Sequence, residues 1–381
     1  MASDLPKILV FIDWFKPAYK AGGPVQSVFN LTAALSADME FYICTSNTDL
    51  GTAEPLAVTS DEWIEFAPNI SVIYLSDTNQ TAETIRSVVH SQKFDAIYMN
   101  SVFSYRFSIL PLWLSRKLAA KRIVASRGML AKGSLALKKT KKTVFLMVAK
   151  LIGLYTNITW HVSAAHEAED VKKQFGPAAK TIIAPNLPNT QSHELVLKEK
   201  KPLELDLFSL ARIAEVKNLL FALQCLNHSF SGAIRYHIYG PIEDEHYWNQ
   251  CKEVINILPE NITVTRHGEL TPDQIHRTIS THDFLFLPTF NENYGHVIIE
   301  SFLASKPVLI SDQTPWRNLA DKHVGFELPL DSKDIWREKI QSYLDLDNDG
   351  YSELSSSAYS YGKEVLERPE DLDLNRSLFL S

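Results

Sequence analysis

Two glutamates, Glu292 and Glu300, are the residues whose type and spacing best fit a chemical role. The apolar run 284–287, a predicted strand, precedes the polar turn that contains Glu292, and a helix is expected to begin near Gly295 or His296. Glu300 then lies about one turn inside the helix, so both carboxylates can face one crevice. Backbone N–H groups at the helix start would suit a phosphate there. A capped surface helix explains the spacing equally well, because acidic residues near a helix N-terminus are stabilising in themselves.

Two cations, Arg212 and Lys217, flank the turn after the predicted strand 206–210. The next helix is expected at 218–229. Cations aimed at a nucleotide diphosphate stabilise the charge that develops on it when it leaves a sugar, and metal ions do this work in other transferases. Taken alone, an arginine and a lysine around a turn are more often solvated surface charges.

A pair of glycines, Gly22 and Gly23, follows the first predicted strand, 7–12, and precedes Pro24. Glycines let a backbone come close to a ligand, and a proline is well placed at a helix start because its missing N–H loses nothing there. On its own, such a turn is weak evidence for a binding site, since most such turns only connect elements.

The segment from Pro288 to Glu300, followed by Lys306-Pro307-Val308, resembles the Glu-x7-Glu signature of retaining glycosyltransferase family 4, also called glycosyl transferases group 1. The sequence departs from the family's usual pattern at Ser301 and Ser305, and serine is a mild change at both places. In that family the first glutamate contacts the transferred sugar and the second binds the ribose hydroxyls of the nucleotide. The family also carries an arginine and a lysine at the spacing of the two cations, and a Gly-Gly loop that faces the donor diphosphate across the crevice.

The resemblance therefore implies roles for individual residues. The catalytic set is Glu292, Arg212 and Lys217, and the donor-binding set is Gly22, Gly23, Gly268, Asn293, Tyr294, Gly295 and Glu300. Gly268-Glu269-Leu270 resembles the loop that meets the nucleotide base. Arg127 stands before Gly128, where the family commonly has a histidine. An arginine cannot act as a general base near neutral pH, but it can pair with phosphate or an anionic acceptor, so Arg127 is an acceptor-side candidate.

Strands and helices must alternate along nearly the whole chain to position these residues. Apolar runs predict strands at 7–12, 40–45, 71–75, 94–99, 122–126, 159–163 and 181–184, and then at 206–210, 235–239, 262–266, 284–287 and 307–310. Helical spacing predicts helices near 25–36, 81–91, 105–120, 164–175, 218–229, 244–256, 272–280, 296–304, 332–344 and 351–366. This alternation predicts an α/β protein with two parallel-sheet domains, whose ligands bind at the carboxyl ends of the strands.

The stretch 185–189, with two prolines and two asparagines, stops regular structure and marks the domain boundary. We expect domains at 1–187 and 188–354. The resemblance implies the GT-B fold, in which two Rossmann-like domains face each other across a cleft. It places the acceptor in the first domain and the nucleotide-sugar donor in the second, and it returns a C-terminal helix, within 355–381, to the first domain.

Composition narrows the possible partners. The net charge is −7, so nucleic acid is not expected as a main partner. Neither the three scattered cysteines nor the histidines have metal-ligand spacing, and the calcium-like run 345–350 has Ser356 where a bidentate glutamate is needed, so we expect no metal. No stretch approaches the length of a transmembrane helix. The N-terminus resembles a strand rather than a signal peptide, so we expect a cytoplasmic protein.

Segment 138–152 combines a lysine cluster with a strongly apolar helical stretch. One interpretation is a peripheral contact with an anionic membrane surface, on the inner face of the plasma membrane. The other is a core helix with a solvated basic end. Both interpretations remain open from the sequence.

The resemblance implies a retaining, metal-independent hexosyltransferase that needs no cofactor. It would move a sugar from a nucleotide-diphosphate donor to a hydroxyl of a glycan or lipid-linked acceptor, in bacterial surface polysaccharide or lipopolysaccharide synthesis. Two alternatives stay open. A sugar-nucleotide epimerase shares the architecture but needs acid and base groups around the sugar, and a non-catalytic nucleotide-sugar-binding protein would keep only the fold.

Overall fold

The computed structural model describes residues 5–136, 139–189 and 194–380. The chain forms two compact units, the first made of Met1–Asn189 with Arg368–Ser381 and the second of Thr190–Glu367. No helix within the described ranges combines the length and the hydrophobicity that a membrane span requires. The three cysteines are buried and unpaired.

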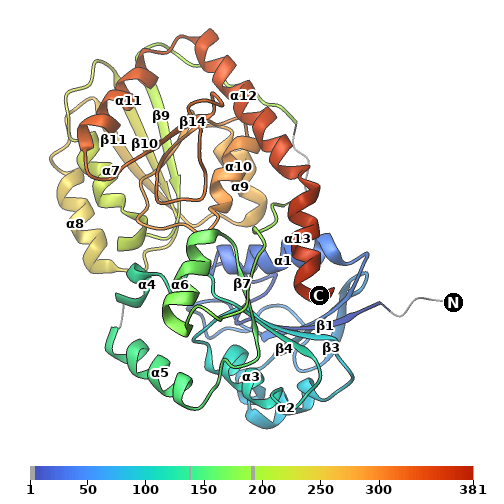
Figure 1. Ribbon diagram of the computed structural model, residues 1–381. Helices are drawn as coiled ribbons and strands as arrows, with labels where there is room; N and C mark the ends of the chain where they lie inside the picture. The colour runs from blue at the N-terminus through green and yellow to red at the C-terminus, as the bar shows by residue number, and fades with distance from the viewer. Residues whose placement is uncertain (1–4, 137–138, 190–193, 381) are drawn as a thin grey trace. The chain divides into compact units, whose positions relative to one another are not determined.

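Unit 1 is built on an eight-stranded sheet in the order β3-β4-β2-β1-β5-β6-β7-β8 (Figure 1). Its strands are β1 (Lys7–Phe11), β2 (Glu40–Ser46), β3 (Trp63–Ala67), β4 (Ile70–Leu75), β5 (Ala96–Met99), β6 (Lys121–Ala125), β7 (Thr159–Val162) and β8 (Thr181–Ile183). All neighbours pair in parallel except β3 and β4. The sheet is buried on both faces, because successive residues of β1 enter different apolar clusters: Leu9 and Phe11 enter one, Ile8 and Val10 the other.

Helices cover both faces of this sheet. The side chains of α2 (Ala82–Val89), α3 (Leu110–Leu114), α5 (Lys139–Leu151) and α6 (Ala165–Phe175) contribute to the cluster around Leu9. The opposite face is covered by α1 (Gly23–Leu35) and by the C-terminal helix α13 (Pro369–Leu380), whose Leu378 and Phe379 are buried there. The remaining short elements are a 3-10 turn at Asp77–Asn79, a π-helical turn at Tyr105–Ile109 and α4 (Lys132–Ala136).

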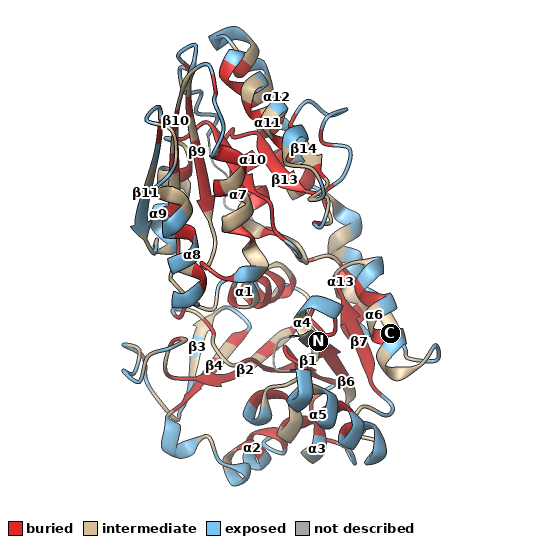
Figure 2. Cartoon of the chain, turned by 90° about the vertical axis from the view of Figure 1, so that its left-hand side faces the viewer, coloured by how far each residue is buried: buried red, intermediate tan, exposed pale blue. Residues whose placement is uncertain are grey.

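Unit 2 has a six-stranded, fully parallel sheet in the order β11-β10-β9-β12-β13-β14. The strands are β9 (Glu204–Leu210), β10 (Ala233–Tyr239), β11 (Ile262–Gly268), β12 (Phe284–Leu287), β13 (Val308–Ser311) and β14 (Gly325–Leu328). One face packs against α7 (Leu219–Leu226), α8 (Glu245–Ile255) and α11 (Lys333–Asp345), and the other against α9 (Pro272–Ile279), α10 (His296–Leu303) and most of α12 (Asn348–Leu366). Figure 2 shows the central strands of both sheets in the buried colour.

The structure differs from the sequence predictions in several elements. Two short edge strands, β3 and β14, were not predicted, and the helix expected at 105–120 is a π-helical turn followed by the short α3. Pro111 at the start of α3 lacks the N–H that would continue a regular helix through this point. Residues 355–367, expected with the first domain, lie in unit 2, because α12 packs on α10 through Tyr361 and Phe302, whose ring centroids are 5.3 Å apart.

Candidate functional site

Lys217 and Glu292 meet in unit 2. The Lys217 Nζ lies 2.5 Å from Glu292 Oε2, and each side chain is only 18% exposed. The two residues are 75 positions apart in the sequence. Lys217 ends a 3-10 turn at Glu215–Lys217, after β9, and Glu292 lies in the loop after β12. Because β9 and β12 are parallel neighbours, their carboxyl ends bring the two loops together.

Backbone hydrogen bonds hold the Glu292 loop in place. Both the Phe290 N–H, at 2.9 Å, and the Thr289 hydroxyl, at 3.0 Å, donate to the Val216 carbonyl oxygen. The Glu292 N–H donates to the Gln313 carbonyl oxygen at 3.1 Å, which ties the loop to the segment after β13. The loop therefore contacts the neighbouring loops on both sides, and its carboxylate is held in a fixed position.

Gly295 adopts a left-handed conformation, with φ of 77°, directly before α10. A Cβ at this position would lie 2.7 Å from Ile298 Cδ1 and 3.0 Å from Glu292 Cγ, so any other residue would have to displace the Ile298 side chain and adopt a strained φ. The helix begins at His296, as the sequence predicts. Glu300 follows one turn into α10 and is half-buried. Asn293 and Tyr294 lie between Glu292 and the helix, and the Trp316 indole N–H donates to the Tyr294 carbonyl oxygen at 2.5 Å.

Arg212 follows β9 and forms an ion pair with Glu243, which was not predicted from the sequence. The loops after β9, β10 and β11 are closely joined. The Ala211 N–H donates to the Tyr239 carbonyl at 3.0 Å, and the Gly240 N–H to the Gly268 carbonyl at 2.7 Å. A Cβ at Gly240 would lie 2.0 Å from the Ala211 carbonyl oxygen, so this close approach requires glycine. Gly268 ends β11 with φ of 84°.

Gly22 and Gly23 lie in unit 1, where Gly22 has φ of 67° and α1 begins at Gly23. Both glycines are exposed, and a Cβ at Gly22 would meet no atom within 4 Å. The preceding turn is fixed by Asp49, a buried residue after β2, whose carboxylate accepts the backbone N–H of Tyr19 at 2.9 Å and of Lys20 at 3.2 Å. The sequence prediction missed Asp49, although an aspartate two residues before Gly51 is itself a turn signal.

Arg127 is engaged by protein groups within unit 1. Its Nε donates to Asn100 Oδ1 at 2.7 Å, its Nη2 to the Tyr98 hydroxyl at 2.8 Å, and its Nη1 to Asn186. Tyr98 in turn is 2.8 Å from Nδ1 of His161. Three of the five N–H groups of the guanidinium thus donate to protein groups. Fewer N–H groups are left to bind an anionic acceptor than the sequence predicts.

Two buried ionisable residues support this network. His161 Nε2 is 2.9 Å from the Ala184 carbonyl oxygen, and burial, reinforced by the Arg127 charge, lowers the pKa of His161 to about 3. Glu167 accepts from the Ser126 hydroxyl at 2.7 Å and from the Gly128 N–H at 2.5 Å, on either side of Arg127. The carboxylate therefore braces the turn in which Arg127 has φ of 46°. Neither residue was singled out from the sequence.

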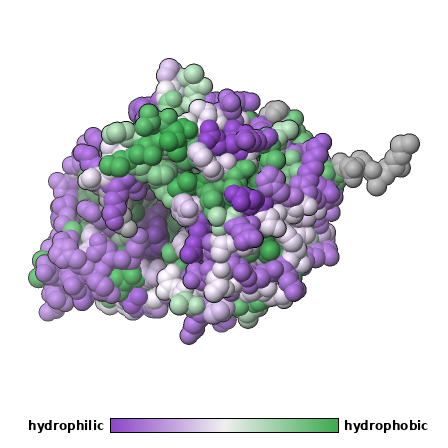
Figure 3. Space-filling model, turned by 90° about the horizontal axis from the view of Figure 1, so that it is seen from below, coloured by the Kyte–Doolittle hydropathy of each residue, from purple (hydrophilic) through white to green (hydrophobic). Residues whose placement is uncertain are grey.

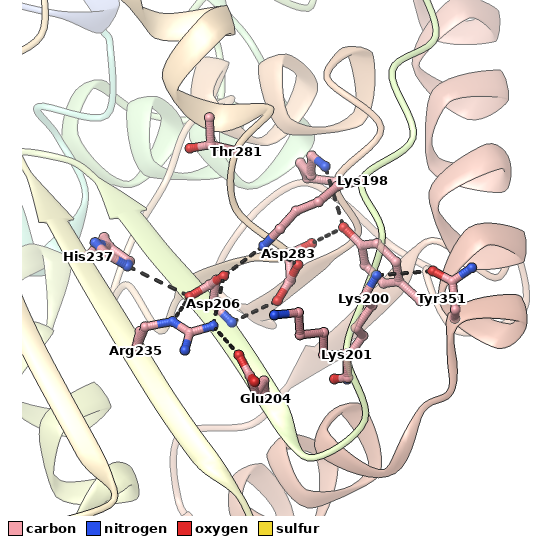
Figure 4. A network of polar contacts seen from close by, with 12 residues as sticks. Lys198, Lys200, Lys201, Glu204, Asp206, Arg235, His237, Thr281, Asp283 and Tyr351 are labelled. Carbon is pink, nitrogen blue, oxygen red and sulfur yellow. Dashed lines mark hydrogen bonds and ion pairs between the residues drawn. The ribbon is translucent and has the colours of Figure 1, made fainter.

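A second polar network lies near the amino ends of β9, β10 and β12, whereas the loops described above follow the carboxyl ends. Figure 4 shows the residues of this network. Lys198 lies 2.7 Å from both Asp206 and Asp283, and Arg235 Nε is 2.5 Å from Asp206. Burial alone would raise the pKa of Asp206, but hydrogen bonds from His237, Arg235 and Lys198 outweigh it and hold the pKa well below its usual range. This network ties the segment entering unit 2 to its sheet.

Unit 1 contains a pocket of 650 Å³ at the carboxyl ends of β1, β2, β4 and β5. Its lining includes Asp13, Trp14, Gln80, Tyr105 and Arg106. The Ser104 hydroxyl donates to Asp13 Oδ1 at 2.6 Å, and Arg106 Nη1 donates to Gln80 Oε1 at 2.7 Å. Burial raises the pKa of Asp13, which the hydrogen bond from Ser104 partly offsets. The pocket thus combines aromatic rings with convergent polar groups.

Within the described ranges, no group of three or more histidine, cysteine, aspartate or glutamate side chains is placed to hold a metal ion. At the carboxyl ends of the unit 2 strands, Arg212 forms an ion pair with Glu243, and Lys217 forms one with Glu292. In such pairs the cations can bind an anionic group of a ligand, and the carboxylates can accept hydrogen bonds from hydroxyl groups of the same ligand.

Comparison with known proteins points to one family. The model of the family described as glycosyl transferases group 1 matches residues 190–365. Sucrose-phosphate synthase from Thermosynechococcus elongatus is similar in structure, with a TM-score of 0.69, 17% identity and coverage of 98% of this chain and 99% of that one. A Staphylococcus aureus TarM variant in complex with fondaparinux, α-GlcNAc-glycerol and UDP has a TM-score of 0.69 at 14% identity, covering 99% and 100%. Anabaena HepE in complex with UDP and glucose has a TM-score of 0.66 at 14% identity, and the match covers 98% of each chain.

No curated protein sequence matches the chain. The solved structures confirm the GT-B fold that the sequence predicts. The family match covers most of unit 2, including both cations and both glutamates discussed above, and it supports the assignment to glycosyl transferases group 1.

Proposed function

We propose, from the match of residues 190–365 to glycosyl transferases group 1, that this protein is a retaining glycosyltransferase. It transfers a hexose-type sugar from a nucleotide-diphosphate sugar to a hydroxyl of a glycan or lipid-linked acceptor. The observation that supports the proposal is the contact between Lys217 and Glu292, because we assign the diphosphate to the first side chain and the sugar to the second. The setting we propose is the synthesis of a bacterial surface polysaccharide or lipopolysaccharide.

In the proposed reaction, the bond between the sugar C1 and the diphosphate oxygen breaks, and its electron pair goes to that oxygen. Arg212 and Lys217 stabilise the resulting charge, in place of a metal ion. Lys217 has three N–H donors, so it can contact a phosphate oxygen while keeping its contact with Glu292. The Glu292 carboxylate orients the sugar as positive charge develops at C1. The acceptor oxygen bonds to C1 from the face that the diphosphate leaves, and its proton passes to the departing phosphate oxygen.

The proposal assigns the remaining donor contacts to the residues that the family resemblance implies. Glu300 binds the ribose hydroxyls, Gly268 borders the nucleotide base, and Asn293, Tyr294 and Gly295 present the start of α10 to the phosphates. Gly22 and Gly23 give the diphosphate an unobstructed backbone to approach, since no side-chain volume is present there.

We place the acceptor in the pocket of unit 1. Trp14 and Tyr105 offer flat apolar surfaces for a sugar ring, and Asp13 and Gln80 offer oxygens that accept its hydroxyl groups. Arg106 lines this pocket beside Asp77, with which its Nη1 forms an ion pair at 2.8 Å, and its other N–H groups can pair with an anionic group on the acceptor. Arg127, the candidate from the sequence, has three of its five N–H groups bonded to protein partners, so we place it second to Arg106 for this contact.

The test begins with a thermal-shift panel of UDP-, GDP- and ADP-sugars, because a ligand that binds only the folded state raises the melting temperature. UDP-sugars come first, since two of the similar structures contain UDP. The best donor is then incubated with the protein, and nucleoside diphosphate release and the sugar product are followed. Release that is lost in Glu292→Gln but kept in Glu338→Gln supports a transferase. Glu338, on the exposed face of α11, is the matched control. Epimer formation without release would favour an epimerase, and binding without either reaction would favour a non-catalytic protein.

A further inference from the structure

Unit 2 contains a pocket of 660 Å³ that is lined by none of the residues assigned above to the donor or the acceptor. Its walls are the start of α7, the loop after β12 and the segment that leads from β14 into α11. The helices α7 and α11 lie side by side on one face of the sheet (Figure 1). The volume falls within the range of about 300–1,000 Å³ that is common for ligand sites. The principal lining residues are Asn218, Phe221, Phe290, Asp331, Lys333 and Arg337.

Arg337 of α11 fixes one wall of this pocket. Its Nε donates to the Cys225 carbonyl oxygen at 3.4 Å, and its Nη2 donates to the Gln224 carbonyl oxygen at 3.2 Å. Both carbonyls belong to α7, so these bonds hold the two helices together. The remaining Nη1 forms an ion pair with Asp334 at 2.9 Å. Three of the five N–H groups of the guanidinium thus donate to protein oxygens, which leaves only two for a ligand.

The charges that line the pocket favour a neutral ligand. Lys333 and Arg337 are balanced by Asp331 and Asp334. An anionic ligand would meet two carboxylates, one of which is already paired with the arginine. Hydroxyl groups suit such a lining better, because a hydroxyl can donate to a carboxylate and accept from an ammonium or amide group. A ligand that is rich in hydroxyl groups and carries no charge therefore fits this pocket best.

Phe290, in the loop after β12, supplies an apolar surface for such a ligand. The residue lines the pocket and is 52% exposed. Its backbone is fixed, because its N–H donates to the Val216 carbonyl oxygen at 2.9 Å. The face of an aromatic ring carries partial negative charge, so it attracts the C–H groups on the flat side of a sugar ring. Among neutral ligands that are rich in hydroxyl groups, the ring therefore indicates a saccharide.

Exposed apolar side chains also occur away from this pocket. Figure 3 views the side of unit 1 on which α3 and α5 lie in Figure 1, and it shows hydrophobic side chains gathered there. Trp113 of α3 is 47% exposed. In segment 138–152, whose first residue lies outside the described residues, Leu146 is buried, as a core helix predicts, whereas Leu151 is 86% exposed. Exposure alone therefore does not identify a site, and Phe290 differs because it lines a pocket together with balanced charges.

Asn218 contributes a buried amide to the same pocket. The residue is 6% exposed and precedes α7, with a left-handed φ of 57°. An asparagine before a helix commonly caps it, but this side chain makes no cap hydrogen bond. Its Nδ2 has no hydrogen-bond partner within the described ranges, although buried polar side chains normally have one. Because a half-turn about the Cβ–Cγ bond exchanges the amide oxygen and nitrogen, the side chain can bond to a ligand hydroxyl with either atom.

We propose that this pocket binds a neutral saccharide, with one sugar ring packed on Phe290. Hydroxyl groups of the saccharide bond to the side chains of Asn218, Asp331 and Lys333. The site is separate from the acceptor pocket that we propose in unit 1, because all of its lining residues belong to unit 2. The proposal goes beyond the glycosyl transfer proposed above and does not rest on it, since saccharide binding is measured without a donor.

The pocket adjoins the Lys217–Glu292 ion pair. Asn218 directly follows Lys217, and Phe290 lies two residues before Glu292. A saccharide that contacts Asn218 and Phe290 therefore contacts both of the loops that hold this pair.

The test is saturation-transfer NMR on the full chain with neutral hexasaccharides of glucose, mannose, galactose or N-acetylglucosamine, without a donor. Tyr105→Ala serves as the background protein, because it removes an aromatic surface from the acceptor pocket proposed in unit 1. We expect at least one hexasaccharide to bind this background protein, with an affinity that does not change with salt concentration. Adding Phe290→Ala should lower the affinity roughly tenfold, as for the loss of an aromatic contact. Adding Asn218→Gly, which suits the left-handed backbone, should lower it about threefold or more.

Two substitutions added to the same background are matched controls. Trp113→Ala removes a similarly exposed aromatic ring, and Asn157→Gly replaces another asparagine with a left-handed φ. Both should leave the affinity unchanged. Phe290→Ala should also keep the melting temperature, because the ring is half-exposed, so it decides the test if Asn218→Gly does not fold.

The proposal is overturned if no hexasaccharide binds, or if Phe290→Ala leaves the affinity of the best one unchanged. Displacement of the bound saccharide by inorganic phosphate would also overturn it, because the pocket would then be an anion site. Such a failure would not affect the transfer reaction, which is tested separately by the release of nucleoside diphosphate. A protein that releases no nucleoside diphosphate could in turn still bind the saccharide here.

Discussion

Replacing Lys217 by methionine removes the cation from the Glu292 carboxylate while keeping most of the side-chain volume. At an effective dielectric constant of about 20, the Coulomb attraction of two charges 2.5 Å apart is about 7 kcal/mol. Desolvation of the two groups, each 18% exposed, cancels much of this energy, so we expect a net coupling of about 1–3 kcal/mol. That range exceeds the contribution of an exposed surface pair, which is typically about 0.2–1 kcal/mol.

The assay is a double-mutant cycle on the free energy of unfolding in urea, with Lys217→Met, Glu292→Gln and the double variant. Each single variant leaves one partner without its counter-charge. The losses of unfolding free energy of the two single variants should therefore add up to more than the loss of the double variant. A coupling energy below about 0.5 kcal/mol would instead show that Lys217 and Glu292 are solvated independently and that the ion pair does not stabilise this site. A paired control is Lys339→Met with Glu338→Gln, whose carboxylate is 75% exposed and whose coupling should be close to zero.

Three further predictions concern the scaffold. Gly295→Ala should lower the free energy of unfolding by about 1–2 kcal/mol, because alanine disfavours a φ of 77°. Adding Ile298→Val should recover stability, because it removes the Cδ1 atom that the new Cβ meets. Urea unfolding of the single and double variants measures both effects. Burial holds the pKa of His161 and His282 at about 3, below the ordinary value of 6.5. Between pH 3 and 6.5 the unfolded state therefore binds more protons than the folded state. As pH is lowered through this window, the free energy of unfolding should fall by up to about 1.4 kcal/mol per pH unit for each histidine. Urea unfolding at pH 7 and pH 5 checks this, and His161→Asn should flatten the dependence for unit 1. Asp206→Asn should cost about 3 kcal/mol of unfolding free energy. It should leave donor turnover unchanged where the protein is folded, since Asp206 lies near the amino end of β9 and the donor loops follow the carboxyl ends of the strands.

Patterns among residues close together in the sequence predicted most strands and helices and the start of α10. The strand β12, which precedes Glu292, is a continuous apolar run, and the start of α10 at His296 follows from Gly295 and the polar turn before it. The parallel sheet then places the loops after β9 and β12 side by side, so the meeting of Lys217 and Glu292 is a consequence of strand order.

Contacts between distant segments could not be predicted in the same way. The three partners of Arg127 come from β5, the loop after it and the segment after β8, and no local pattern links them. Asp49 supports the turn before Gly22 from a separate strand end. The edge strand β3 has exposed residues and weak alternation, so its pairing with β4 was not visible as an apolar run.

We propose above that unit 2 holds a nucleotide-diphosphate sugar with its reacting sugar at Glu292. The most direct measurement is the rate of nucleoside diphosphate release from the preferred donor by wild type and by Glu292→Gln, together with the affinity of each for the free nucleoside diphosphate. We expect Glu292→Gln to lower the rate about a hundredfold or more, which is typical for removal of one transition-state contact, and to change the affinity little. Equal rates for the two proteins would contradict this proposal.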